Sequence, residues 1–566
     1  HGILTALNAS LQALETRDPI GRELHDSAEA GLAALQDGLA RAGQPLDVTL
    51  HGIGHAHMDI AYLWPIAQIR QKNARTYSNV LRLMEKFPDY RFSHSQPQLY
   101  EMTRQDFPDI FEAIRARIAE GRWEVIGGMW VEADANIPGA EALVRQILLG
   151  RQYVRDMFGD VETPVLWLPD TFGFPWSLPQ LMKLAGLEYF VTNKLNWNQY
   201  NRMPSSTTWW QGIDGTRVLA HFLTTPRVVQ HLPFPTNYKS DLSAREVAGT
   251  WRNSTTKEHL RDLPICYGYG DGGGGPTEDL IRRAQAFGSM PGMPRMRPST
   301  VREAMAALAE GAESLPVWNG ELYLEGHRGT LTSQGWLKRA NRKAEVLLHE
   351  TEALMVMAAP GGACEEDRRA LQEAWRILCL NQFHDILTGT SVPQVFEDAR
   401  RDFERIEGLA GALRDRATRT LSAAAQPGTG WLIVNSAPAA SAGPVELAID
   451  GPVALPDGSP LDVQPTGAGT LIDLPAIPPY GILELRRSPG QAEPPVQPLA
   501  GRSTAGAWLE NSALRVEFDA GGRLTRLFDK TAQREVLAPG QMGNQLWLYE
   551  DRPLSWDAWD IDAFFE

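Results

Sequence analysis

The stretch LDVTLHGIGHAHMDIAYLWP, residues 46–65, starts as an apolar run and continues into histidines, an aspartate and aromatic residues. Residues 46–54 favour a β-strand, in which alternate side chains share a face. His57 and Asp59 then lie on one side at the strand end, with Cα atoms about 6.6 Å apart, and can hold one metal ion. His55 faces the same side from further back along the strand. A buried histidine beside a helix-capping aspartate explains the stretch equally well.

The whole chain divides into four regions that differ in their sequence pattern. Residues 1–45 predict amphipathic helices. In residues 46–325 short apolar runs alternate with helical patterns, which indicates a parallel, (β/α) barrel-like catalytic domain with its active site at the carboxyl ends of the strands. Residues 326–425 predict a helical bundle, and residues 426–566 a C-terminal antiparallel β-sandwich. We therefore expect a multidomain protein of α/β, α and β parts.

Composition narrows the classes of partner. The 566 residues carry a formal net charge of -15 and no cluster of Lys and Arg, which argues against nucleic acid and anionic membranes as partners. No stretch is apolar enough for a membrane span. Cys266, Cys364 and Cys379 form neither a disulfide framework nor a metal motif, so we expect a cytoplasmic protein. The sequence leaves a homo-oligomer open. It begins with His1 and stops at WDAWDIDAFFE, so we expect cuts at both ends and an incomplete sandwich.

Two further aspartates follow predicted strands. In PVLWLPDTFGFPW, Asp170 comes directly after an apolar run and stands among aromatic residues. In LPICYGYGDGGGGPT, Asp271 follows a strand and precedes four glycines and a helix. The glycines favour a mobile loop that presents Asp271, because the lysine of a phosphate-binding loop is missing. Plain turn-forming aspartates are the alternative at both positions.

A polar group stands near the end of a predicted helix. In the segment EEDRRALQEAWRILCLNQFHDILTGTS, Asn381, His384 and Asp385 are three and four residues apart and share a helix face. Capping of a helix end is the alternative explanation.

Taken together, these residues suit one metal site. Two imidazoles and two carboxylates, from His57, Asp59, Asp170 and His384, leave room for a substrate oxygen on Zn²⁺, and the same set tolerates Co²⁺ or Mn²⁺. Asp271 adds the second carboxyl group that glycoside cleavage requires. Nearby aromatic rings suit stacking on sugar faces.

The motifs HAHMDIAYLW, GGMWVEADANIPGAEALVRQ, WLPDTFGF, TNKLNWNQYN, GYGDGGGGPT, HRGTLTSQ and NQFHDILTGTS occur in this order. With them the chain resembles the class II α-mannosidases of glycoside hydrolase family 38, from about residue 50 to the end. TNKLNWN and GDGGGGP are most similar to the cytosolic and vacuolar branch. That branch has an extra N-terminal β-domain and a longer C-terminal β-region, in keeping with cuts at both ends.

The resemblance implies a role for each matching residue. It makes His57, Asp59 and His384 zinc ligands, Asp170 both ligand and nucleophile, and Asp271 the general acid and base. Two further residues would bind the sugar: Asp385 would contact hydroxyl groups of the sugar, and Trp64 would stack on the sugar ring. Lys194, His327, Arg328 and Trp197 are candidates for further substrate contacts, which surface ion pairs and packing explain nearly as well.

The expected activity is a retaining, zinc-dependent exo-α-mannosidase that removes terminal α-linked mannose from oligosaccharides or a small mannoside. A mannosylglycerate-type hydrolase of the same family is one alternative. A second is a metal-dependent amidohydrolase-like barrel, for which His221 and His259 are candidate ligands. A third is a carbohydrate-binding protein with a structural metal.

Overall fold

The computed structural model describes residues 2–229, 231–425, 430–488 and 499–562. This part of the chain forms two compact units. The first contains the described residues to Leu348, together with Arg369–Ala410 and Pro553–Ile561. The second contains His349–Arg368, the described part of Gly411–Arg552, and Asp562. All of the site residues predicted from the sequence belong to the first unit.

The stretch quoted above forms the central strand of a parallel sheet. That strand, β1 (Leu46–His55), pairs in parallel with each of its partners. The sheet has the order β3-β2-β1-β8, with β9 also paired to β1: β2 (Phe92–His94), β3 (Trp123–Val125), β8 (Asp262–Tyr267) and β9 (Pro294–Pro298). The strand predicted over residues 46–54 is thus confirmed, and His57 and Asp59 follow its end.

A second sheet has the order β10-β6-β7-β5-β4. Its strands are β4 (Val165–Trp167), β5 (Tyr189–Thr192), β6 (Thr207–Gln211), β7 (Arg217–Phe222) and β10 (Val317–Asn319). Strands β4, β5 and β7 run parallel, whereas β6 is antiparallel to β7. The predicted parallel pairing is therefore confirmed. The described strands pair as two separate sheets, so closure into one barrel stays a prediction.

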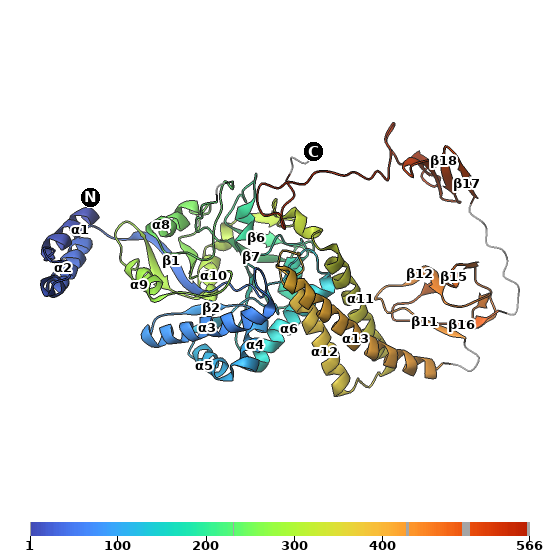
Figure 1. Cartoon of the computed structure of the whole chain (residues 1–566), viewed down its shortest axis with the longest axis horizontal. Coiled ribbons are helices and arrows are strands. Elements are labelled where there is room, and N and C mark those ends of the chain that lie inside the picture. Colours follow the sequence, from blue (N-terminus) through green and yellow to red (C-terminus); the bar gives the residue numbers. More distant parts are fainter. Residues whose placement is uncertain (1, 230, 426–429, 489–498, 563–566) are drawn as a thin grey trace. The chain divides into compact units, whose positions relative to one another are not determined.

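Helices α1 (Gly2–Ala13) and α2 (Arg22–Arg41) precede β1 and pack against each other. The helices that connect and flank the strands (Figure 1) are α3 (Ile66–Lys86), α4 (Pro97–Asp106), α5 (Pro108–Ala119), α6 (Ala140–Phe158), α7 (Leu178–Leu184), α8 (Ala244–Asn253), α9 (Glu278–Ala286) and α10 (Val301–Glu310). Short 3-10 turns lie at Lys194–Trp197, Ala312–Ser314 and Arg328–Leu331. Leu50 and Ile53 from the first sheet share one hydrophobic core with Trp167 and Phe190 from the second. Both sheets therefore support the same site.

Three long helices fall in the region predicted as helical: α11 (Gly335–Ala358), α12 (Glu365–Asn381) and α13 (Pro393–Ala423). The prediction that His384 and Asp385 share a helix face is wrong, because α12 ends at Asn381 and turns follow it. The backbone N–H of His384 donates to the carbonyl of Glu132, and Phe383 forms a bridge with Ala133. These long-range bonds replace the next turn of the helix. No helix in the described residues is both long and apolar enough to cross a membrane.

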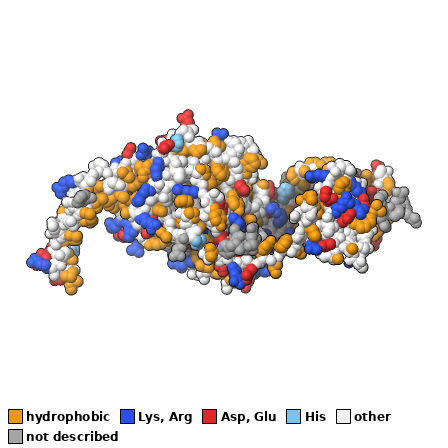
Figure 2. All heavy atoms as spheres, turned by 90° about the horizontal axis from the view of Figure 1, so that it is seen from above, with side chains coloured by type: hydrophobic (Ala, Val, Ile, Leu, Met, Phe, Trp, Pro, Cys, Tyr) orange, Lys and Arg blue, Asp and Glu red, His pale blue; other side chains and the backbone are white. Residues whose placement is uncertain are grey.

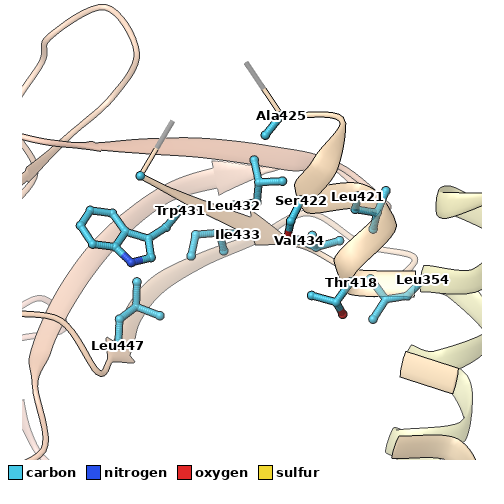
Figure 3. Close-up of a pocket in the computed structure, with 11 residues that line it drawn as sticks. Leu354, Thr418, Leu421, Ser422, Ala425, Trp431, Leu432, Ile433, Val434 and Leu447 are labelled. Carbon is cyan, nitrogen blue, oxygen red and sulfur yellow. The ribbon is translucent and has the colours of Figure 1, made fainter. Parts of the chain in front are cut away.

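The second unit contains antiparallel sheets, as predicted for the C-terminal region. One has the order β11-β16-β13 and another β12-β15-β14: β11 (Trp431–Val434), β12 (Ser441–Leu447), β13 (Val453–Ala454), β14 (Val463–Pro465), β15 (Thr470–Ile477) and β16 (Ile482–Arg487). Val453, Ile472 and Leu485 place residues of both sheets in one small core, and closure into a β-sandwich stays a prediction. A pocket beside β11, lined mainly by apolar residues such as Leu421 and Trp431, lies within this unit (Figure 3).

A further antiparallel sheet follows in sequence order: β17 (Leu499–Ser503), β18 (Gly506–Glu510), β19 (Leu514–Asp519), β20 (Leu524–Asp529) and β21 (Arg534–Glu535). The domain boundaries at residues 45, 325 and 425 stay predictions. Acidic and basic side chains are interspersed over the face of the molecule that Figure 2 shows.

Candidate active site

One cavity in the first unit collects side chains from the carboxyl ends of strands in both sheets. Loops after β1, β4, β5, β7 and β8 contribute to it, together with the turns after α12. This is the edge at which parallel α/β proteins place their active sites. The cavity is lined by Asp59, Tyr62, Asp170, Phe172, Lys194, Trp197, Arg227, Tyr238, Asp271, His327, Asp385, Trp556 and Trp559.

The four predicted metal ligands lie together at the buried end of this cavity. Nε2 of His57 is 2.9 Å from Oδ1 of Asp59 and 3.8 Å from Oδ2 of Asp170. Nε2 of His384 is 3.3 Å from the same oxygen of Asp59. A nitrogen of each histidine and an oxygen of Asp170 lie within 4.8 Å of one another. The structure therefore brings together residues separated by more than 300 positions in the chain.

The donor set of this cluster fits a divalent cation. Nε2 of His57, Nε2 of His384 and Oδ1 of Asp59 are buried and make no hydrogen bond with acceptable geometry. Buried polar atoms without a partner destabilise a fold by about 1–3 kcal/mol each, so several of them aimed at one point call for a ligand. Two imidazole nitrogens with carboxylate oxygens suit Zn²⁺.

The electrostatics of the cluster favour positive charge. Burial alone would lower the pKa of His384, but the nearby carboxylates of Asp59 and Asp385 raise that pKa to about 9. Burial would likewise lower the pKa of His57, yet the charges of Asp59 and Glu132 raise it well above its usual range. The carboxylates thus create a negative potential that a bound cation would balance.

Glu132 orients both histidines, and the sequence did not single it out. Its Oε2 lies 3.2 Å from Nδ1 of His57, and its backbone oxygen lies 2.8 Å from Nδ1 of His384. Ser95 donates a hydrogen bond to Oε1 of Glu132, and the Glu132 backbone N–H donates to Oε1 of Gln96. One residue from the loop after β3 therefore turns the Nε2 atoms of both imidazoles towards the cluster, which is what metal-binding histidines require.

Asp170 and Asp271 approach each other above the cluster. The Tyr238 hydroxyl lies 2.9 Å from Oδ2 of Asp170 and 3.2 Å from Oδ1 of Asp271. Lys194 donates to Oδ1 of Asp170 at 2.6 Å, and Lys239 contacts both oxygens of Asp271, at 2.7 and 2.6 Å. Burial would raise the pKa of Asp170, but the charge of Lys194 and of the neighbouring histidines lowers it far below its usual range. Asp170 is therefore held as a carboxylate.

The glycine-rich loop that carries Asp271 is attached to the end of β1. The backbone N–H of Asp59 donates to the Asp271 carbonyl at 2.7 Å, and Thr76 accepts from the N–H of Gly274. Asp271 has a φ of +58°, a left-handed conformation that is uncommon outside glycine and often found at functional sites. Tyr238 and Lys239 lie in the loop after β7, where no sequence pattern marked them.

The predicted substrate-binding residues divide into two groups. Asp385, Lys194 and His327 line the cavity. Burial and the charge of Asp59 raise the pKa of Asp385 to about 7. Trp64 is not among the lining residues: its Nε1 donates to the Asp59 carbonyl and Lys72 stacks on its ring, with Nζ 3.4 Å from the ring centre. Arg328 also lies outside the lining and donates to the Glu325 carbonyl at 3.1 Å.

Other predicted histidines lie away from the cavity. His55 is buried on β1 and contacts the Ser93 carbonyl through Nδ1 at 2.9 Å. His221, on β7, contacts the Thr207 hydroxyl, and His259 contacts Ser314. Neither His221 nor His259 lines the cavity, so the additional ligands of an amidohydrolase-like site are not supplied by them.

Comparisons with known proteins agree along the chain. Family profiles match in succession: the glycosyl hydrolases family 38 N-terminal domain over residues 47–321, the alpha mannosidase middle domain over 325–421 and the glycosyl hydrolases family 38 C-terminal domain over 509–566. The human protein named Alpha-mannosidase 2C1 is 36% identical over 98% of this chain and 51% of its own length. The Alpha-mannosidase of Saccharomyces cerevisiae is 34% identical over 67% of this chain and 35% of its own length.

A solved structure shares the fold. The crystal structure of an alpha-mannosidase from Enterococcus faecalis V583 superposes with a TM-score of 0.68 at 19% sequence identity, covering 86% of this chain and 61% of that one. The chain spans about half or less of the length of the two curated relatives described above.

Proposed function

The chain belongs to glycosyl hydrolase family 38, and from this premise we propose that it is a retaining, metal-dependent exo-α-mannosidase acting on terminal α-linked mannose. The observation that carries the proposal is the convergence of His57, Asp59, Asp170 and His384 beside a second carboxyl group, Asp271. The names of the relatives support mannose as the sugar.

In this proposal Asp170 is the nucleophile. It attacks the anomeric carbon and forms a covalent glycosyl-enzyme, while the bond to the leaving oxygen breaks. Lys194 and Tyr238 hold one oxygen each, which keeps the carboxylate ionised and fixes its direction. Asp170 is largely buried, with a side chain 16% exposed, so only a sugar ring inserted into the cavity reaches it.

Asp271 then serves as general acid and base. It protonates the leaving oxygen in the first step and removes a proton from water in the second. Its side chain is 40% exposed, which suits a group that meets both the leaving sugar and incoming water. Lys239 and Tyr238 position it from the loop after β7.

The spacing of the two carboxyl groups supports retention of configuration. The Tyr238 hydroxyl lies 2.9 Å from Oδ2 of Asp170 and 3.2 Å from Oδ1 of Asp271. The distance between these two carboxylate oxygens therefore cannot exceed the sum of the two contact distances. Retaining enzymes place the carboxyl groups about 5–5.5 Å apart, and inverting enzymes about 6.5–9.5 Å. This upper limit on the oxygen–oxygen distance is compatible with the spacing of the retaining class, and retention is part of the proposal.

His57, Asp59, Asp170 and His384 would hold the metal, for which Zn²⁺ fits best and Co²⁺ or Mn²⁺ are substitutes. When bound, the ion supplies Lewis-acid stabilisation of negative charge on oxygen. Glu132 fixes the direction of both imidazoles. The three cysteines are free thiols, and we keep the predicted cytoplasmic location as part of the proposal.

The test is release of p-nitrophenol from its α-mannoside by the purified protein. We expect turnover that a chelator abolishes and Zn²⁺ restores, and a first product that NMR identifies as α-mannose. Parallel assays with mannosylglycerate and α-mannobioses identify the preferred leaving group. No hydrolysis of any mannoside by the zinc-loaded protein would contradict the proposal and would favour a carbohydrate-binding protein.

A further inference from the structure

One wall of the active-site cavity comes from a segment distant in the chain, residues 553–561. Trp556 and Trp559 of this segment line the cavity. The ring centre of Trp556 lies 5.8 Å from that of Trp197 and 5.7 Å from that of His327. The ring centre of Trp559 lies 6.4 Å from that of His327. The segment thus adds two indole rings to an aromatic wall that the (β/α) region alone does not complete.

A buried carboxylate fixes the segment against the wall. Asp560 is 4% exposed, and its Oδ1 accepts a hydrogen bond from the backbone N–H of His327 and lies 3.0 Å from Nδ1 of that ring. The Ser333 hydroxyl donates to the Ala558 carbonyl at 3.0 Å. A Cβ added at Gly329 would lie only 3.0 Å from the Trp559 carbonyl oxygen, so the two backbones are in close contact. The position of the two indoles is therefore set by several contacts.

The backbone is strained on both sides of this contact. His327 has a φ of +62° and Trp556 a φ of +57°. Left-handed conformations in residues with large side chains cost on the order of 1–3 kcal/mol each and persist where the surroundings impose them. Here the two residues face each other in the cavity wall, with ring centres 5.7 Å apart, so the contacts of the wall hold both in this conformation.

The wall borders the same cavity as the two proposed catalytic carboxylates, Asp170 and Asp271. A terminal mannose has to reach Asp170, whose side chain is 16% exposed, whereas the proposed acid, Asp271, is 40% exposed. The part of the substrate beyond the scissile bond therefore lies towards the open side. Trp556 and Trp559 are partly exposed in the same cavity. Indole rings offer an apolar face and one N–H donor, which match the C–H face and the hydroxyl groups of a pyranose ring.

We infer that Trp556 and Trp559 form the binding site for the leaving-group sugar, so that the protein selects oligosaccharides over mannosides without a second ring. This inference rests on the proposed function. It predicts that the two tryptophans contribute binding energy only for substrates whose leaving group contains a pyranose ring. Their contribution is then absent for a substrate whose leaving group is a single atom.

The test compares kcat/KM for the α-mannobiose that the wild type cleaves fastest with kcat/KM for α-mannosyl fluoride. We expect the ratio of the two values to fall about 10- to 200-fold in Trp556→Ala and Trp559→Ala, the range for loss of one apolar contact. Trp336→Ala is the matched control, because Trp336 lies in the same unit and stacks on Arg400 outside the cavity. Its ratio should stay within about twofold of the wild-type value.

Phenylalanine variants separate stacking from loss of structure, and they carry the test if an alanine variant does not fold. Trp556→Phe and Trp559→Phe keep an aromatic face and should retain most of the wild-type ratio. An unchanged ratio in the alanine variants, with both substrates slowed equally, would overturn the inference and leave the proposed function standing. A wild-type protein that hydrolyses neither substrate would overturn the proposed function and this inference with it.

Discussion

Replacing Glu132 tests how the metal site is built. Glu132 contacts His57 through its carboxylate and His384 through its backbone oxygen, so a side-chain substitution removes the partner of one histidine and leaves the partner of the other. Loss of such partners weakens metal binding by about 10- to 100-fold. Glu132→Gln retains an acceptor near His57, and we expect about a tenfold increase in the Kd for Zn²⁺. Glu132→Ala leaves no acceptor there, and we expect the Kd for Zn²⁺ to rise about 100-fold, which corresponds to a loss of roughly 2.7 kcal/mol of binding free energy.

The assay is titration of the apoprotein with Zn²⁺ in competition with a fluorescent chelator, which gives Kd and stoichiometry without relying on activity. Glu345→Gln is the control, because Glu345 is a buried carboxylate whose side chain accepts hydrogen bonds from the Gly139 N–H and from Asn341 instead of from a histidine. We expect the control to bind one Zn²⁺ with nearly wild-type affinity. Equal Kd values for wild type and both Glu132 variants, or an equal loss in the control, would refute the reasoning.

Further predictions concern the carboxylates, the metal and pH. Asp170→Asn should lower kcat on p-nitrophenyl α-mannoside by about 10⁴-fold or more, and retention of full activity would exclude Asp170 as nucleophile. Tyr238→Phe removes a hydroxyl that contacts two carboxylates, so kcat/KM should fall about 10- to 100-fold, and an unchanged value would show that the hydroxyl is dispensable. Free Zn²⁺ at about 100 times its Kd should stabilise the apoprotein by about 2.7 kcal/mol in thermal or denaturant unfolding, and no change would contradict binding to the folded state. Burial lowers the pKa of Lys338 to about 8, so from that pH to roughly 10.4 the unfolded chain binds more protons and stability rises with pH. The free energy of unfolding of Lys338→Met, measured at pH 8 and pH 10, should lack this rise. An identical pH dependence of unfolding in wild type and variant would refute the role of Lys338.

The strand ends and their acidic residues could be predicted because they depend on local pattern. An apolar run followed by Asp59, Asp170 or Asp271 marks a buried strand and a polar loop, and parallel strands bring such loops to one edge. The prediction needed no knowledge of which strands are neighbours. The structure bears out the parallel pairing and brings these three aspartates into one cavity.

Other parts of the site depend on tertiary contacts that have no local signal. His384 was expected on a helix, yet backbone bonds to the loop after β3 end that helix at Asn381. Tyr238 lies in an irregular loop, and its role follows only from the carboxylates that surround it. Trp556 comes from the far end of the chain, and only folding shows that it meets His327. Glu132 belongs to one of the motifs that identify the family, but the motif alone does not predict which of its residues contacts the two histidines.

The central claim is that one divalent cation binds where distant parts of the chain converge. Crystals of the zinc-loaded protein, measured on both sides of the zinc absorption edge, test it directly. We predict a single strong anomalous peak bounded by Nε2 of His57, Nε2 of His384 and carboxylate oxygens of Asp59 and Asp170. Zinc-saturated crystals with no peak among these atoms, or with the peak elsewhere, would contradict it.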